Sequence, residues 1–201
     1  MTAQIPDILL LQDKKFYLAG INGQGLFNPA DYDLHPMPRV TSCWRGYVCE
    51  YKVLSDNFLL DTLKINLGKS LPNEGPHAFA AEEGPVLNGR KPVLAATIHE
   101  IFNNTYNDLN LQIDFTGGIL AASDFIQKLY VHMGFHPAWK YKNVIELVIS
   151  HGQIAETRDV SDAMWEIRNR MIKSGMEPDV HASSEEIRKW IAETFRLDYN
   201  F

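Results

Sequence analysis

Two histidines within an aromatic stretch are the densest group of side chains in the sequence that could do chemistry. The stretch covers residues 130–139, begins with Tyr130, ends with Trp139, and places His132 and His136 four residues apart. On an extended strand, an even separation puts both imidazoles on one face. Two imidazoles can bind zinc or another divalent metal, and a catalytic site of that kind also needs a third protein ligand and an open position.

Spacing alone selects no third ligand for such a metal. The candidates are His99, Glu100, Asp61, Glu146 and His151. The simpler interpretation is that the two histidines form loop hydrogen bonds or face water. We therefore expect no bound metal and no other cofactor, and we keep a metal-dependent hydrolase that uses this histidine pair as an alternative.

A second group lies in residues 43–47. Its tryptophan and arginine suit a flat or anionic ligand, because the indole of Trp44 offers an aromatic face and the guanidinium of Arg45 pairs with carboxylate or phosphate. Gly46 would allow a backbone to approach closely. The alternative is a sheet-edge tryptophan beside a salt-bridged arginine. Cys43 could act as a nucleophile only if the fold placed a base beside it.

The remaining motifs are weaker. Thr116-Gly117-Gly118 lacks the dinucleotide-binding glycine pattern and the lysine of a phosphate loop, so we predict a bulge or tight turn there. Asp61 lies on an apolar strand face, where a carboxyl group has either a raised pKa or a hydrogen-bonded partner. The sequence has no serine-hydrolase elbow, zinc-protease helix or calcium-loop motif. It names no catalytic residue and does not decide whether the chain is an enzyme.

Charge and apolar pattern argue against two classes of partner. The net charge is −6 and the pI is about 5.6, with lysine and arginine scattered along the chain, so we expect no nucleic-acid binding. The apolar run at residues 8–11 is too short for a signal peptide or a membrane span, so we expect a cytoplasmic protein that binds no membrane. In that compartment Cys43 and Cys49 should remain reduced thiols.

Alternating apolar residues predict that much of the chain is β-strand. The clearest case is a hairpin over residues 40–66, with Ser55-Asp56-Asn57 as its turn. His151-Gly152 predicts a second tight turn. Further strands are predicted at residues 8–11, 16–18, 109–115, 129–133 and 144–149. Residues 68–92 form a glycine- and proline-rich loop, and helical spacing of apolar residues predicts a short helix over 93–102.

From Val160 the apolar spacing becomes helical. One helix is predicted from Val160 to about Met171, and a second follows Pro178 with a capping box of Ser183 and Glu186. The predicted fold class is α+β: a mainly antiparallel barrel or partial barrel with two C-terminal amphipathic helices, with a β-sandwich as the second choice. Residues 1–159 would form the β-rich domain, and residues 160–201 a helical pair packed on it.

The amphipathic helices also suggest an alternative role in self-association. If they pair across a symmetry axis, Trp165, Trp190 and Phe195 could anchor the interface of a homodimer. The chain would then be a structural oligomer.

Four segments together resemble a group of uncharacterised bacterial proteins. They are CWRGYV at 43–48, LNG at 87–89 with Pro92, FTGGIL at 115–120 and LYVHMGFHPAW at 129–139. The resemblance covers roughly residues 6–159 and is most specific around 130–134. That group has no established activity, so the resemblance implies a bacterial, cytoplasmic protein and transfers no catalytic residue.

These observations favour a binding module over an enzyme. Aromatic and basic residues gather near predicted strand ends without a recognisable catalytic set. The ligand, a small molecule or a partner protein, would contact Trp44, Arg45, Tyr130, His132, His136 and Trp139. The hypothesis requires the segments around Trp44 and His132 to meet in space, with Arg45 and His136 within about 10 Å of each other on one concave face.

Overall fold

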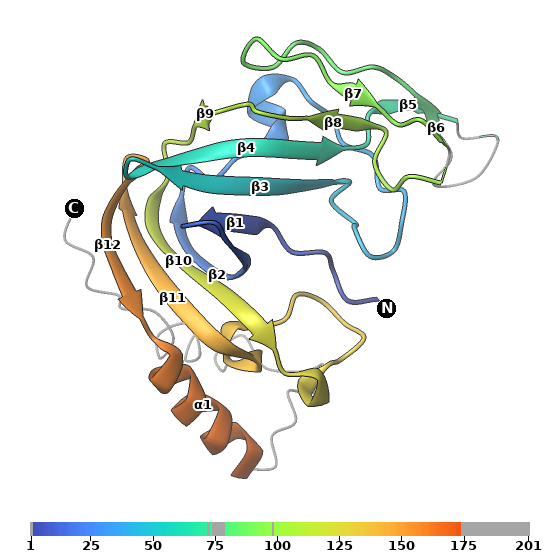
Figure 1. Cartoon of the computed structure of the whole chain (residues 1–201). Coiled ribbons are helices and arrows are strands. Elements are labelled where there is room, and N and C mark those ends of the chain that lie inside the picture. Colours follow the sequence, from blue (N-terminus) through green and yellow to red (C-terminus); the bar gives the residue numbers. More distant parts are fainter. Residues whose placement is uncertain (1, 72, 74–78, 98, 174–201) are drawn as a thin grey trace.

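The computed structural model describes residues 2–71, 73, 79–97 and 99–173, and its main feature is a closed, mixed β-barrel of seven strands (Figure 1). The barrel strands are β1 (Ile8–Leu11), β2 (Lys14–Gln24), β3 (Tyr47–Leu54), β4 (Asn57–Ile65), β10 (Thr116–Phe125), β11 (Tyr141–Ser150) and β12 (Gln153–Asp159). Their order around the barrel is β12-β11-β10-β2-β1-β3-β4, and β4 closes onto β12. The barrel prediction is confirmed. One pairing, β1 with β3, is parallel, and the other barrel pairs are antiparallel.

Three hairpins of the barrel turn through two residues that both have positive φ. The pairs are Gln12-Asp13, Ser55-Asp56 and His151-Gly152, with φ between 46° and 73°. Two-residue turns of this kind match the right-handed twist of the flanking strands, and aspartate and glycine tolerate the left-handed backbone well. The predicted turns at residues 55–57 and 151–152 are therefore confirmed, as is the hairpin that starts at Ile8.

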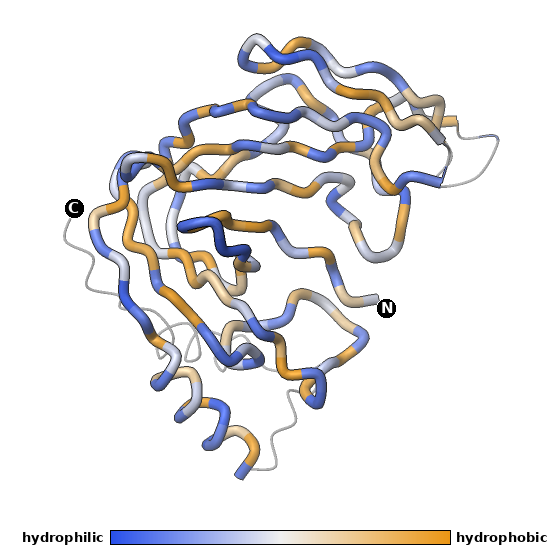
Figure 2. The backbone as a smooth tube through the Cα atoms, viewed as in Figure 1, coloured by the Kyte–Doolittle hydropathy of each residue, from blue (hydrophilic) through white to orange (hydrophobic). Residues whose placement is uncertain are grey.

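The barrel interior is filled by apolar side chains. Tyr51 and Phe58 stack with ring centroids 4.8 Å apart, and Phe58 also contacts Phe115 at 6.2 Å. They belong to a continuous buried cluster with contributions from every barrel strand except β12, whose Ile154 packs against it. Apolar residues recur along the strands, whereas the β1–β2 turn is hydrophilic (Figure 2). Because side chains occupy the interior, a ligand would bind at the rim or on the outer surface.

A second core lies outside the barrel, where α1 (Ser161–Lys173) covers β10 and β11. Met164, Ile167 and Met171 of the helix pack in a cluster with Leu120 and Val144 of these strands. The carboxylate of Asp159 accepts a hydrogen bond from the N–H of Ser161, the first residue of the helix. Hydrogen bonds from the Ser161 side chain and backbone hold the pKa of Asp159 below its usual value. The first predicted helix is confirmed. The second falls outside the described residues, as do Trp190 and Phe195. No helix in the described part of the chain is long and apolar enough to cross a membrane.

Further short strands lie outside the barrel. They are β5 (Gly68–Ser70), β6 (Phe79–Ala81), β7 (Val93–Leu94), β8 (Asn104–Tyr106) and β9 (Leu111–Gln112). Of these, β8 and β9 pair with β4, β7 pairs with β8, and β5 and β6 pair with each other in a separate sheet. The buried side chains of Asn103 and Asn104 hold the surrounding loops: Asn103 accepts from the Leu67 N–H, and Asn104 accepts from the Gly84 N–H. These bonds satisfy backbone groups that no strand ladder serves.

The helix predicted over residues 93–102 is wrong. Val93 and Leu94 instead pair with Thr105 and Asn104, and the Ala95 N–H donates to the Asn103 carbonyl. A helix of about ten residues is marginal without strong tertiary support. Here the apolar side chains of Val93 and Leu94 are exposed, so this segment has no buried apolar face that would stabilise a helix.

Two further local predictions are wrong. Residues 129–133 form no strand, because the N–H groups of Leu129 and Tyr130 donate to Ile126 and Gln127 in a short 3-10 turn (Gln127–Leu129). Thr116-Gly117-Gly118 does not interrupt the chain but begins β10. A Cβ on Gly117 would lie 2.2 Å from the Asn22 carbonyl oxygen, so glycine is needed there for the close approach of β2 and β10.

Candidate functional site

The N-terminal segment brings the two predicted site segments together. The Gln4 N–H donates to the Gly134 carbonyl at 2.8 Å, and the Gln4 side-chain oxygen accepts from the Trp44 N–H at 3.0 Å. The Ile5 N–H donates to the Ser42 carbonyl. Residues 3–5 therefore lie between the loop that carries Trp44 and the loop that carries His132 and His136. We call the meeting of these two loops and residues 3–5 the junction.

Arg45 lies in the loop that carries Trp44, and the buried carboxylate of Asp7 fixes its side chain. Its two terminal nitrogens donate to the two carboxylate oxygens of Asp7 at 2.9 and 2.5 Å, and its Nε donates to the Tyr47 carbonyl. Asp7 also accepts from the buried Cys49 N–H at 2.6 Å. Burial alone would lower the pKa of Arg45, but the Asp7 carboxylate outweighs it and raises that pKa overall. The guanidinium is thus a structural element, in line with the alternative interpretation of a salt-bridged arginine.

The planar face of Arg45 packs between two aromatic rings. Its Cζ lies 4.8 Å from the ring centroid of Tyr47 and 5.7 Å from that of Phe135. Because Phe135 precedes His136 directly, this contact shows that the two predicted segments meet. Asp7 was missed in the sequence. A single acid in front of the apolar run 8–11 was the only available signal for Asp7.

Large apolar side chains remain exposed around this junction. We define the aromatic patch as Trp44, Tyr130, Val131 and Phe135, whose exposed fractions are 58%, 43%, 38% and 52%. Three of the four come from the single loop that follows β10. Exposed tryptophan and tyrosine side chains that cluster on rigid segments are typical of binding surfaces.

Both predicted histidines lie against Tyr130. The ring centroid of Tyr130 is 4.9 Å from that of His132 and 5.2 Å from that of His136, and the Tyr130 hydroxyl lies 3.5 Å from Nδ1 of His132. His136 also packs on Phe125 at 4.7 Å, and Phe125 contacts Tyr141 at 5.1 Å. We call these five residues the imidazole cluster: Phe125, Tyr130, His132, His136 and Tyr141.

The environment of His136 is unusual. Both of its ring nitrogens are buried, and neither has a hydrogen-bond partner among the described residues. Burial lowers the pKa of His136, and the positive charge of Lys140 lowers it further, so the imidazole is neutral near pH 7. A neutral imidazole offers one donor and one acceptor.

Lys140 and Trp139 support the cluster from the next turn of chain. Trp139 is 5% exposed and belongs to the core under α1, so its ring is not offered to a ligand. Lys140 is 2% exposed, and its Nζ lies 5.4 Å from the centroid of the Trp139 ring. Burial lowers the pKa of Lys140. The sequence signal for Lys140 was a lysine directly between two aromatic residues, Trp139 and Tyr141.

The described residues do not assemble a metal site. No group of three or more histidine, cysteine, aspartate or glutamate side chains gathers among them in a way that could hold an ion. Three of the residues considered as a third ligand are paired elsewhere: Asp61 with Lys52, Glu146 with Arg158 and His151 with Asp114. Within the described residues, the histidine pair therefore has no third ligand of the kind that a catalytic metal needs.

Cys43 and Cys49 are both buried and unpaired. The Cys43 thiol lies 3.3 Å from the Tyr47 carbonyl oxygen, to which it donates, and burial raises its pKa. A thiol with a raised pKa is a poor nucleophile at neutral pH. This geometry offers no support for cysteine catalysis at Cys43.

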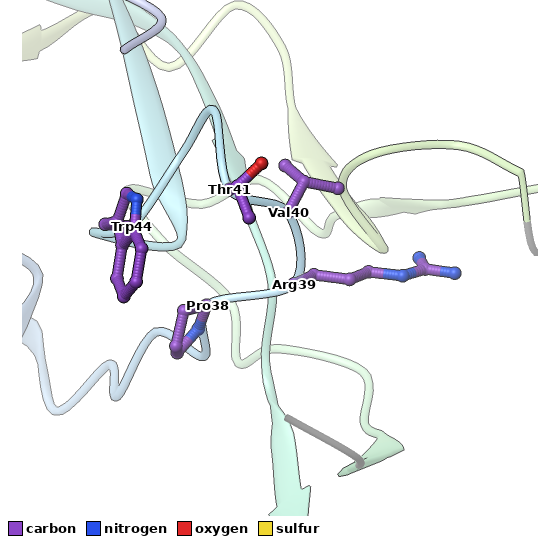
Figure 3. A pocket seen from close by; sticks show the side chains of 5 residues that line it. All are labelled: Pro38, Arg39, Val40, Thr41 and Trp44. Atoms are coloured by element: carbon purple, nitrogen blue, oxygen red, sulfur yellow. The ribbon is translucent and has the colours of Figure 1, made fainter. Parts of the chain in front are cut away.

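A small pocket opens beside Trp44, with a volume of about 50 Å³ (Figure 3). It is lined by Pro38, Arg39, Val40, Thr41 and Trp44. In Figure 3 the Trp44 indole and the Pro38 ring lie on the same side, while Arg39 extends away from them. Arg39 donates to the Glu100 carbonyl at 2.9 Å. Pockets for whole small molecules measure about 300–1,000 Å³, so this one has room only for a small group.

Comparisons with protein-family models, with curated proteins and with solved structures found no match for this chain. They assign no role to any residue, so the function has to be argued from the geometry of the junction and the imidazole cluster.

Proposed function

We propose that this protein is a binding module for a small organic molecule, which it holds at the imidazole cluster. The observation that carries the proposal is His136, whose two buried ring nitrogens lack partners while its ring packs between Phe125 and Tyr130. A buried polar group without a hydrogen bond costs about 1–3 kcal/mol. A ligand that bonds to this imidazole would recover that free energy.

The surroundings favour a flat ligand. Aromatic rings stack or meet edge-on at centroid distances of about 4.5–7 Å, and the rings of Phe125, Tyr130 and Tyr141 already use such contacts with one another and with His136. A planar molecule with a polar edge could extend the same packing and bond to the imidazole. The aromatic patch would then form the rim of the site.

Rigid support for the loops is a further argument for binding. The ion pair of Asp7 and Arg45 fixes the loop that carries Trp44, and Phe135 packs on the same guanidinium. Preorganised loops lose less conformational entropy when a ligand binds. In this proposal Arg45 and Trp139 support the site, and Tyr130, His132 and His136 contact the ligand.

A ligand-detected NMR screen of flat heteroaromatic compounds against the full chain tests the proposal. Compounds that bind should perturb the ring signals of His136 and Tyr130. The variant His136→Phe keeps the aromatic packing and removes both nitrogens, so affinity should fall at least about tenfold, which corresponds to one hydrogen bond. The matched control is His35→Phe, since His35 is an exposed histidine remote in sequence from the cluster. Equal affinity of all hits for the wild type and His136→Phe would overturn the proposal, as would a screen without hits.

A second candidate function is self-association through α1. Trp165 and Ile172 are 59% and 60% exposed, and their separation of seven residues places them on one helix face. If this face is an interface, Trp165→Glu should convert a dimer to a monomer in light scattering. A wild-type chain that is already monomeric would remove this candidate.

A further inference from the structure

We propose that the junction is also a docking surface for a partner protein, which supplies a short acidic segment with one apolar side chain that anchors in the pocket beside Trp44. This inference goes beyond the proposed function, because it concerns the pocket and the aromatic patch and not the ring of His136. It starts from large apolar side chains that the fold leaves exposed on fixed loops.

Trp44 and Phe135 are the two most exposed members of the aromatic patch, at 58% and 52%. They lie on neighbouring loops, because the ring of Phe135 packs on the guanidinium of Arg45, the residue that follows Trp44. The backbone beneath them is fixed, since the Gln4 side chain accepts from the Trp44 N–H and the Gln4 N–H donates to the Gly134 carbonyl. Large aromatic side chains exposed on rigid segments are the usual anchors of protein–protein contacts.

The pocket beside Trp44 fits one apolar side chain. Its volume of about 50 Å³ holds about three to five groups the size of a water molecule, since one such group needs about 10–15 Å³. A proline ring or a leucine side chain has that size. The indole of Trp44 and the ring of Pro38 lie on the same side in Figure 3, and Val40 adds a third apolar side chain to the lining. The occupant is therefore one side chain of a larger partner.

The charges around the junction favour a negatively charged partner. The three segments that meet there, residues 2–6, 34–46 and 126–140, contain four lysine or arginine residues and no aspartate or glutamate. The acid that follows the first segment, Asp7, is buried and pairs with Arg45. The whole chain has a net charge of −6, so the rest of the molecule carries the excess of acid. Charge complementarity of this kind selects acidic partners and speeds their association.

The number of cations fits a peptide better than a membrane or a nucleic acid. Lys128 is exposed and Arg39 lines the pocket, whereas Lys140 is buried. Anionic lipid headgroups are bound by clusters of about four to eight lysine and arginine residues, and a phosphate backbone is bound by similarly dense positive charge. Lys128 and Arg39 instead match a few carboxylates on either side of one apolar side chain.

Selection from a displayed library of random dodecapeptides on the immobilised full chain tests the proposal. We expect the enriched peptides to be acidic and to share a proline or a leucine. As labelled synthetic peptides they should bind the full chain in fluorescence anisotropy, and Trp44→Ala should weaken this binding at least about tenfold, as truncation of an aromatic anchor does. The matched control, Leu54→Ala, should retain the wild-type affinity, because Leu54 is 56% exposed at the opposite end of β3 from Tyr47.

The charge of the partner is tested at Lys128. Lys128→Glu should lower the affinity for the enriched peptides at least about threefold and reduce its dependence on salt, because it replaces an attraction by a repulsion. Lys14→Glu makes the same charge change beside the β1–β2 turn, at the far end of β1 from Asp7, and should have no such effect. β1 is four residues long, about 13 Å, which exceeds the Debye length of about 8 Å at physiological salt.

A selection without enrichment overturns the docking surface, as do enriched peptides that bind Trp44→Ala as tightly as the wild type. Enriched peptides that are neutral or basic, or an equal loss of affinity in Lys128→Glu and Lys14→Glu, refute the acidic partner. Tighter binding of phosphatidylserine vesicles or of oligothymidylate than of every enriched peptide would assign the surface to another class of partner and overturn the proposal as well.

A measurement on the wild type covers the case in which Trp44→Ala does not fold. A saturating enriched peptide should shift the NMR signal of the Trp44 indole N–H. It should leave the signal of Trp139 in place, since Trp139 is 5% exposed and packs under α1. An unshifted Trp44 signal with the peptide bound would place the contact elsewhere and overturn the inference.

Discussion

Asp7 and Arg45 form a bidentate ion pair in which the acid is the more deeply buried partner, with side-chain exposures of 4% and 27%. The pair joins the start of β1 to the loop before β3, and the Cys49 N–H donates to the same carboxylate. It therefore anchors the junction on which the site depends. Removing one member would leave the other charge without its partner.

We predict that Asp7→Asn lowers the free energy of unfolding by about 3–5 kcal/mol, the usual cost of breaking a buried ion pair from one side. Urea denaturation measures this loss. Asp13→Asn is the matched control, because Asp13 lies in an exposed turn with φ of 61° that asparagine tolerates. A loss below about 1 kcal/mol for Asp7→Asn would mean that water, not Asp7, satisfies Arg45.

His136 should make stability depend on pH in a defined direction. Its pKa in the folded chain lies below the ordinary value of 6.5, so between these two values the unfolded chain binds a proton that the folded chain does not. Stability should therefore be complete above about pH 6.5 and fall as the pH drops through 6.5 toward the folded pKa.

The check is to measure the free energy of unfolding of the wild type and of His136→Gln at pH 7.5 and at pH 5.5. The wild type should lose more stability between these conditions than the variant. His35→Gln, which removes an exposed histidine, should retain the wild-type difference. The same pH dependence in His136→Gln would show that other groups cause it.

Substitutions at Gly117 and Gly134 can distinguish the energetic cost of steric crowding from the cost of a left-handed backbone. Both have positive φ, of 145° and 61°, but a Cβ on Gly117 would meet the Asn22 carbonyl oxygen at 2.2 Å, whereas a Cβ on Gly134 would meet no atom within 4 Å. We expect Gly134→Ala to cost about 1–2 kcal/mol for the left-handed backbone alone. Gly117→Ala should cost clearly more in the same urea experiment, because β2 and β10 must also separate. Equal losses would contradict this explanation.

The helix core can be tested with two apolar side chains of α1. Met164 is 1% exposed and packs on the outer face of the barrel, so Met164→Ala should lower stability by about 2–5 kcal/mol. Ile172 is 60% exposed, and Ile172→Ala should change stability by less than about 0.5 kcal/mol. A small effect at Met164 would indicate that α1 is not a fixed part of the domain.

The sequence predicted the turns and the helix α1 correctly, because each of these elements depends on residues that are close together in the chain. Ser55-Asp56 and His151-Gly152 are turn sequences between alternating strands, and both form the expected hairpins. The helical stripe that begins at Val160 gives α1. The many short strands predicted a barrel or partial barrel, but not its closure between β4 and β12. The parallel pairing of β1 with β3 was not predicted either, because it joins segments about 40 residues apart and leaves no local pattern.

The site was predicted only in outline. The two segments were anticipated, since aromatic and basic residues concentrate there, but the packing of His132 and His136 against Tyr130 was not. The partner of Arg45 was not, because Asp7 lies 38 residues away. Trp139 looked accessible in the sequence, but α1 covers it. Burial of this kind is set by tertiary packing and cannot be read from spacing.

The closure of the barrel between β4 and β12 suggests where the molecule opens first. This seam has one register pair, Gln153 with Asn57, reinforced by the Ile154 N–H donating to Asp56 and the Phe58 N–H donating to Gly152. The pairing of β10 with β11, by contrast, extends along nearly the whole of both strands. Amide hydrogens at the seam should therefore exchange with solvent through local fluctuations, while those between β10 and β11 exchange only when the domain unfolds. The imidazole cluster lies at the end of the β10–β11 pair, in the part of the barrel that this motion leaves intact.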